Sequence, residues 1–156
     1  MDNNVQKQLN ELKNKKITWE QIEFKDGFYL TVSLPGVLSQ TTGYYDQFFI
    51  ARRPMEVLRV SEVHTTAGDD AGAVVLDVEK LTSSTAPGSG TSILTTTFDL
   101  KSTANTVVTK EQRNLSSARQ LKENERLALK DTGVLTSLVG VCVILYCKFL
   151  TKGSYR

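Results

Sequence analysis

Apolar and polar residues alternate in short stretches along most of the chain, with turn-forming residues between them. The stretch 73–81, AVVLDVEKL, is the clearest, because Val74, Leu76 and Val78 share one face of a strand and Asp77 and Glu79 share the other. Similar patterns predict strands at 17–24, 27–34, 46–53, 55–66, 93–100, 105–109 and 134–150. These stretches account for most of the chain, which therefore reads as β-rich.

Glycine, proline and small polar residues mark the ends of these stretches. Asp26 and Gly27 are typical of a hairpin turn before the strand predicted at 27–34. Pro35 and Gly36 are expected to end that strand. Pro54 is expected to break one strand or start the next. The segment 82–92, TSSTAPGSGTS, reads as a long loop.

The stretch 55–66 is expected to present two different faces. One face carries Val57, Arg59, Ser61 and Val63, and the other carries Leu58, Val60, Glu62 and His64. In all, the pattern predicts about eight to ten strands with turns every 8–12 residues and no regular alternation with helices, which is typical of an antiparallel sandwich or barrel. We expect a single β-sandwich domain over 17–156.

The first 16 residues form a separate arm with a helical pattern. Val5, Leu9 and Leu12 fall at i, i+4 and i+7, which makes one narrow apolar stripe. Three apolar residues do not hold so short a helix together in water, so the arm must dock on something. Its own domain and a partner protein both fit the pattern.

Two further segments leave alternatives open. Residues 110–126 have helical propensity, with Ser117 as a candidate cap, although Leu115, Ala118 and Leu121 are sparse. Residues 134–150 form an apolar run that a membrane anchor or a buried strand explains. The run is shorter than the ~20 residues of a membrane span and is rich in β-branched residues, which favours the strand.

The two cysteines, Cys142 and Cys147, lie within this apolar run. Their spacing puts them on opposite faces of a strand, where a bond between them would be strained. We expect buried free thiols, which indicate assembly in a reducing cytoplasm. No secretory signal is recognised at the start of the chain.

The residue types argue against catalysis, a metal or a cofactor. The net charge is +2 and the basic residues are dispersed among acids, which does not favour a nucleic-acid partner. His64 is the one histidine, and Asp69 or Asp70 across the next turn are its candidate partners, but no nucleophile motif accompanies it. The spaced acids of a calcium loop and the ligands of a zinc site are absent. The sequence predicts a protein that is not an enzyme.

Aromatic residues gather near one loop. Tyr44, Tyr45, Phe48 and Phe49 suit contact with a protein or glycan, but they also suit a core formed by the two phenylalanines and covered by the tyrosines. The burial preference of aromatic residues favours the second interpretation.

The stretch 60–107 resembles a known family of proteins. Its pattern is a strand ending in EVHTTAG, a strand ending in VEKLT, the loop TAPGSG and then FDLKSTANTV, and the later ERLALKDTGVLTSLVGVCVILYCKF is similar to a closing hairpin. These features resemble capsid decoration, or cement, proteins and head-fibre-type proteins of tailed bacteriophages. The resemblance covers roughly residues 24–150, leaves the arm outside and is less marked in the charged segment 110–126.

The resemblance implies a jelly-roll-like β-sandwich that trimerises on a capsid. It implies that residues 115–125 form a strand and a turn, with the tight turn at Asn124 and Glu125, and that 134–150 is a core strand. The expected partners are the major capsid protein and two further copies of this chain, on the outside of the virion. We expect docking through Val5, Leu9, Leu12 and Trp19, and loop contacts through Tyr44, Tyr45 and Pro87. A head-fibre or vertex protein that binds a receptor or glycan is the alternative.

Overall fold

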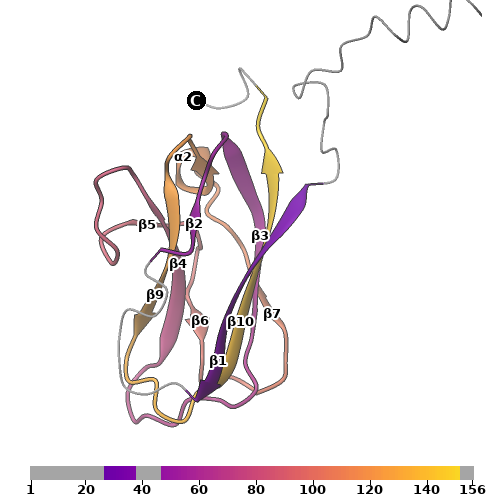
Figure 1. Ribbon diagram of the computed structural model, residues 1–156. Helices are drawn as coiled ribbons and strands as arrows, with labels where there is room; N and C mark the ends of the chain where they lie inside the picture. Colours follow the sequence, from indigo (N-terminus) through magenta and orange to yellow (C-terminus); the bar gives the residue numbers. More distant parts are fainter. Residues whose placement is uncertain (1–26, 38–46, 152–156) are drawn as a thin grey trace, which may run out of the picture.

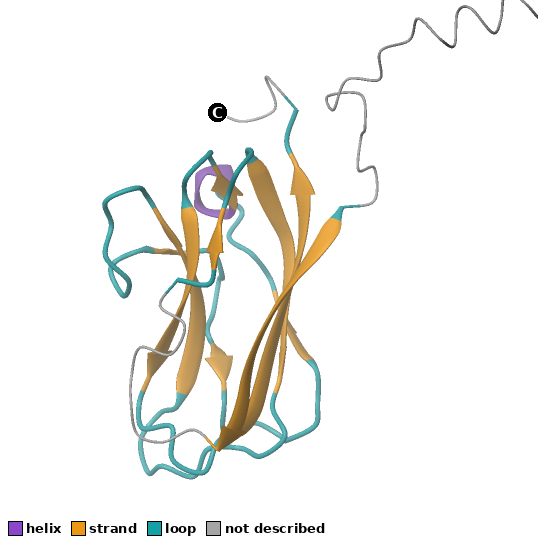
Figure 2. Ribbon diagram, in the orientation of Figure 1, coloured by secondary structure: helices purple, strands orange, loops and turns teal. Residues whose placement is uncertain are grey.

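The structure, a computed structural model, describes residues 27–37 and 47–151. The helical arm, the predicted strand at 17–24 and the loop with Tyr44 and Tyr45 lie outside the described residues. The described chain forms ten strands and one helical turn, α2 (Ser116–Arg119), as Figure 1 and Figure 2 show.

The strands form two antiparallel sheets that face each other. The first sheet, called here the β1 sheet, has the order β1 (Phe28–Val37), β10 (Val139–Phe149), β3 (Met55–Val63) and β7 (Val108–Lys110), with β8 (Gln120–Leu121) also paired to β3. The second, the β4 sheet, has the order β2 (Phe49–Ile50), β9 (Arg126–Thr132), β4 (Val75–Leu81) and β5 (Thr91–Ser92), with β6 (Phe98–Asp99) also paired to β4. Figure 1 shows the two layers side by side.

The chain crosses between the two sheets at most of its connections. β1, β3, β7 and β10 belong to the β1 sheet, and β2, β4 and β9, which lie between them in the chain, belong to the β4 sheet. A chain that winds back and forth around the sandwich in this way has the jelly-roll arrangement. The predicted fold class, an antiparallel jelly-roll-like β-sandwich, is confirmed.

The core lies between the sheets and is supplied by alternate residues of the long strands. On β10, Val141, Val143, Leu145 and Cys147 are buried, while the residues between them face outward. The opposite layer contributes the inward positions of β4 and β9 together with Phe98, the largest side chain that is fully buried. The inward positions predicted for β4, at 74, 76 and 78, are confirmed.

The faces predicted for 55–66 are wrong at one position. Val57 is fully buried, although it was grouped with the exposed Arg59. The register between β3 and β10 shifts between Tyr146 and Cys147, so Leu58 is an extra residue opposite the partner strand. Such a bulge reverses the alternation, and residues 55 and 57 point inward before it while 60, 62 and 64 point inward after it.

The predicted ends of several strands also differ from the structure. Pro35 and Gly36 do not end the first strand, because β1 continues to Val37 across a register shift after Leu34. Proline is tolerated there because β1 is the edge of its sheet and the irregularity removes the need for its missing N–H. Most of the strand predicted at 93–100 is loop, and only Phe98–Asp99 pairs as β6.

Residues 110–126 combine features of both expectations. Residues 116–119 form one helical turn, with Leu115 rather than Ser117 at its N-cap position, so the prediction of strand and turn alone is wrong. β8 follows, and Asn124 then takes a positive φ of 67°. The tight turn implied at Asn124 and Glu125 is therefore confirmed.

The apolar run near the C-terminus is a strand where the structure describes it. Val139–Phe149 is β10, and in the described part of the chain no helix has the length and apolar character that crossing a membrane requires. Both cysteines are free and point to opposite faces as predicted, but only Cys147 is buried, since Cys142 is half-buried.

We predict that Gly133→Ala destabilises the domain more than Gly88→Ala does. Both glycines have positive φ, +97° and +82°, so alanine costs about 1–2 kcal/mol in backbone strain at each. A Cβ at position 133 would also lie 1.9 Å from the carbonyl oxygen of Ala73, whereas one at position 88 meets nothing within 4 Å. Urea unfolding should show at least ~1 kcal/mol more loss for Gly133→Ala. Equal losses would contradict this account of the turn.

Candidate interaction surface

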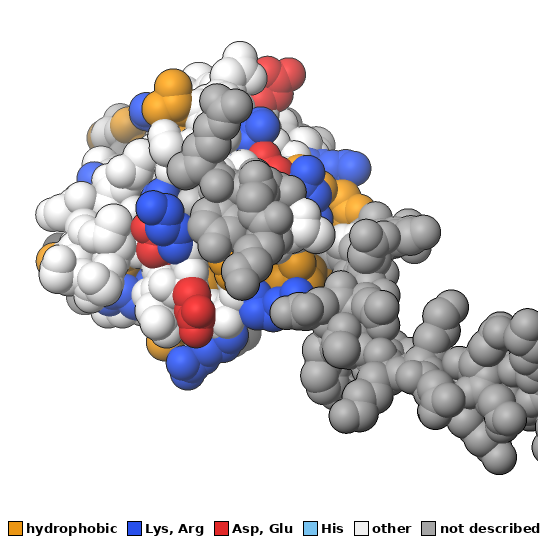
Figure 3. Space-filling model, turned by 90° about the horizontal axis from the view of Figure 1, so that it is seen from above, with side chains coloured by type: hydrophobic (Ala, Val, Ile, Leu, Met, Phe, Trp, Pro, Cys, Tyr) orange, Lys and Arg blue, Asp and Glu red, His pale blue; other side chains and the backbone are white. Residues whose placement is uncertain are grey.

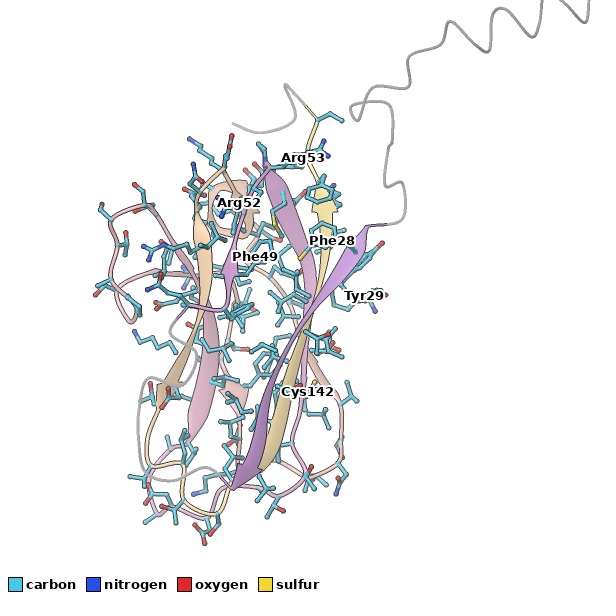
Figure 4. All side chains as sticks on the ribbon, in the orientation of Figure 1. Phe28, Tyr29, Phe49, Arg52, Arg53 and Cys142 are labelled. Carbon is cyan, nitrogen blue, oxygen red and sulfur yellow. The ribbon has the colours of Figure 1, made fainter. Side chains whose placement is uncertain are left out.

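The side of the β1 sheet that faces away from the core is mostly uncharged and partly apolar over much of its area. Its residues line up across three strands because the register pairs Tyr29 with Tyr146 and Arg59, Thr31 with Ile144 and Ser61, and Ser33 with Cys142 and Val63. These nine residues are called here the outer face. Arg59 is its one charged member, and Figure 4 shows Tyr29 on the opposite side of β1 from Phe28.

The side chains of the outer face hold one another in place. The rings of Tyr29 and Tyr146 lie 5.0 Å apart between centroids, and the Arg59 guanidinium lies 5.9 Å from the Tyr146 ring. The hydroxyl of Ser61 is 2.8 Å from that of Thr109 on β7. These contacts order the surface before any partner arrives, which reduces the entropy lost on binding.

The outer face is open to solvent at Ile144 in its centre and at Tyr29 on the edge strand. Tyr29 is 68% exposed and Ile144 is 37% exposed, so no described segment covers them. By contrast, the end of the sandwich seen in Figure 3 carries charged side chains among neutral ones. A mostly uncharged surface with exposed aromatic residues is typical of a protein contact.

A second ordered surface element is the loop 82–90 between β4 and β5. Glu79 is only 1% exposed, and its carboxylate accepts hydrogen bonds from the backbone N–H groups of Gly88 and Gly90, the latter at 2.9 Å. The prediction that Glu79 lies on an exposed face is therefore wrong, because the loop folds back over this side of β4. A Cβ at Gly90 would lie 2.6 Å from the Leu81 side chain, so the close approach requires glycine.

Two basic residues of β9 hold the same loop from the other side. Lys130 donates a hydrogen bond to the Gly88 carbonyl at 2.9 Å, and Arg126 donates to the carbonyls of Thr82 and Thr85, both at 2.7 Å. The loop, seen at the left of Figure 1, is thus a fixed projection of small uncharged residues. Pro87, predicted to make loop contacts, lies in it and is half-buried.

The other residues predicted for contacts are only partly covered by the structure. Val5, Leu9, Leu12, Trp19, Tyr44 and Tyr45 lie outside the described residues. Phe48 and Phe49 are half-buried and pack against the core, which agrees with the interpretation that favoured a core role. Sequence reasoning did not predict the outer face. The signal was present, because the strand 141–147 has uncharged residues on both of its faces.

The histidine and acidic residues considered for catalysis or metal binding do not belong to the outer face. His64, directly after β3, is buried and contacts Glu62, so the candidate partners Asp69 and Asp70 are wrong. Asp69 instead accepts a hydrogen bond from Ser137. No cluster of three or more histidine, cysteine or acidic residues able to hold a metal occurs in 27–37 or 47–151.

Comparisons with known proteins identify a similar fold but do not assign the chain to a family. No family model matches the sequence, and no curated protein matches it. Among solved structures, the chain is similar to a chain from the capsid of Ralstonia phage GP4, with a TM-score of 0.57 and 12% identity. The match covers 81% of this chain and 86% of that chain, so the likeness extends over nearly the whole fold. The class established here is a jelly-roll β-sandwich of a kind found in a phage capsid.

We predict that Glu79→Ala releases the loop 82–90. The substitution leaves the N–H groups of Gly88 and Gly90 without their carboxylate, and hydrogen bonds to a charged group are worth about 1.5–3 kcal/mol. Hydrogen exchange should accelerate at these two amides, and urea unfolding should report a loss within that range. Glu123→Ala, at an exposed position in another turn, is the control and should change stability by no more than ~0.5 kcal/mol. Unchanged exchange in the loop would show that Glu79 does not hold it.

The two cysteines should differ in reactivity. Burial raises the pKa of the Cys147 thiol to about 12, so at about pH 8 it is both neutral and enclosed. We expect iodoacetamide to modify Cys142 on the outer face of the folded protein and to leave Cys147 unmodified, as peptide mass spectrometry can show. Unfolding in urea should make both react. Comparable labelling of the two in the folded protein would contradict the burial of Cys147.

Proposed function

We propose that this chain is a structural virion protein that binds the outside of a bacteriophage capsid and stabilises it. The observation that carries the proposal is the likeness of the whole jelly roll to a chain from a phage capsid. The neutral outer face and the anchored loop 82–90 support it, because both are ordered surfaces suited to contact. The role of a cement protein also agrees with the sequence resemblance.

Stabilisation follows from binding to the assembled state. A protein that bridges neighbouring capsid subunits binds the intact shell and not the separated subunits, so rupture of the shell must also break its contacts. In this proposal the outer face, with its exposed residues Tyr29 and Ile144, is one contact with the major capsid protein. The apolar stripe of Val5, Leu9 and Leu12, with Trp19, is the second contact.

A trimer would protect the most vulnerable edge of the sandwich. β1 is an edge strand of ten residues, whereas the other edge strands, β2, β5 and β7, have two or three. Its segment 28–34 carries no charge or proline, the features that normally prevent edge-to-edge association. Three copies arranged in a ring cover such an edge on each copy, with loops around Tyr44, Tyr45 and Pro87 meeting neighbours or facing outward.

A second candidate is a head-fibre or vertex protein that binds a receptor or glycan. The observation that favours it is the exposed ring of Tyr29 beside the hydroxyl groups of Thr31 and Ser33. An aromatic ring with neighbouring hydrogen-bonding groups also suits a sugar. The same face therefore serves both candidates, and binding experiments separate them.

Co-sedimentation with capsids that lack this protein tests the proposal. We expect the full chain to bind, Tyr29→Glu to weaken binding at least about tenfold, and Leu115→Glu to bind normally. Tyr29 and Leu115 are both 68% exposed, so the two variants introduce the same charge at equally open positions on different surfaces. A combined Val5→Ser, Leu9→Ser and Leu12→Ser variant tests the arm in the same assay.

The outcomes distinguish the candidates. Loss of binding in the Tyr29 variant alone assigns docking to the outer face, and loss in the arm variant assigns it to the arm. If the full chain does not bind capsids but binds a glycan array through Tyr29, the receptor-binding candidate replaces the cement proposal. Sedimentation equilibrium of the unbound chain gives the oligomer size, and a monomer on and off the capsid would refute the trimer.

A further inference from the structure

His64 and Glu62 form a polar pair inside the sandwich. Both side chains are fully buried, and Nδ1 of His64 lies 3.0 Å from Oε1 of Glu62. The other ring nitrogen, Nε2, lies 3.1 Å from the carbonyl oxygen of Ser102 in the connection between β6 and β7. The imidazole thus joins the end of β3 to a segment 38 residues further along the chain.

This arrangement fixes the number of protons that the pair must hold. The Ser102 carbonyl can only accept, so Nε2 of His64 carries a hydrogen. The contact between Nδ1 and Glu62 then needs one more hydrogen, either on the nitrogen as imidazolium with glutamate or on the oxygen as neutral imidazole with glutamic acid. Both forms contain one proton more than a neutral histidine beside a glutamate.

In the contacts of the described residues, His64 is the only charged group that pairs with Glu62. Glu62 lies between Val143 on β10 and Val108 on β7, and Lys110, two residues further along β7, is opposite Val60 on the same side of the sheet. The Oε2 atom of Glu62 has no hydrogen-bond partner among the described residues. Burial also raises the pKa of Glu62. The charged groups of the neighbouring loops bond elsewhere: Asp69 to Ser137, Asp70 to Gly72, and Lys101 to the carbonyls of Asp70 and Gly72.

We propose that Glu62 and His64 hold one shared proton and act as a pH-sensitive clamp between β3 and the connection 100–107. Loss of the proton leaves the imidazole with one N–H for two acceptors, so either the hydrogen bond to Glu62 or the one to the Ser102 carbonyl is lost, together with the charge balance of the pair. The same connection is tied to β3 by the Asn105 N–H, which donates to the His64 carbonyl at 2.7 Å. Release of the imidazole therefore loosens the connection.

The direction of the pH effect follows from proton counts. In the unfolded chain glutamate is ionised above about pH 4.3 and histidine is neutral above about pH 6.5, whereas the folded pair keeps its proton. The contribution of the pair is therefore fully present between about pH 4.3 and about pH 6.5, where the unfolded chain also holds one proton on these two residues. Above that pH the folding equilibrium constant falls by up to about tenfold per pH unit, until the folded pair loses its proton as well.

Glu62→Gln tests the clamp because glutamine completes the same contacts without a shared proton. Its amide N–H donates to Nδ1 of His64, and Nε2–H still donates to Ser102. We expect the decline in stability above about pH 6.5 to flatten in this variant, measured by urea unfolding across the pH range. Glu79→Gln, which changes a buried carboxylate without a histidine partner, is the matched control and should keep the decline. An unchanged pH dependence in Glu62→Gln overturns the proposal.

Nuclear magnetic resonance of the wild-type chain tests the same idea without a substitution. The amide of Asn105 reports on the connection, because it donates to the His64 carbonyl at 2.7 Å. We expect the protection factor of this amide to fall as pH rises above about 6.5. Protection that is independent of pH would refute the clamp even if the Glu62 variant does not fold.

Discussion

The alternation of buried and outward residues along β10 is the constraint on which the structure depends. This strand pairs with β1 on one side and β3 on the other, so it holds the β1 sheet together. Its inward residues, from Val141 to Cys147, form the centre of the core. Its outward residues Cys142, Ile144 and Tyr146 are uncharged, while the outward Lys148 near its end pairs with Glu56. The three uncharged residues make the outer face a surface suited to a partner. One alternating run of residues therefore sets both the core and the candidate contact surface.

Buried carboxylates connect this framework to its loops. Glu79 receives the backbone N–H groups of the loop 82–90, Glu62 engages His64 near the connection 100–107, and Glu56 pairs with Arg119 at 2.7 Å and Lys148 at 3.0 Å. A buried carboxylate is costly without such partners, so each one penalises alternative loop positions. The result is a sandwich whose surfaces are ordered in advance, as a protein that reinforces an assembly by contact requires.

The proposed role depends on these ordered surfaces rather than on reactive groups. The exposed aromatic ring of Tyr29 lies next to a long uncharged edge strand, and the fixed loop around Pro87 projects from the other sheet. Contacts at several separated points on a rigid body allow one molecule to bridge more than one neighbour. The likeness to a chain from the capsid of Ralstonia phage GP4 concerns the fold.

The sequence by itself determined the β-rich class, most of the strands and the long loop that follows β4. Alternation and turn chemistry act between residues that are neighbours in the chain, so a sequence displays them directly. Only the tertiary structure decided that Glu79 is buried, that His64 pairs with Glu62 and Ser102, and that the bulge in β3 turns Val57 inward. Those outcomes depend on segments brought together across the sandwich, at separations of up to 38 residues for His64 and more for the pairing of β3 with β10. The sequence pattern of one strand does not determine which residues a distant strand or loop brings into contact with it.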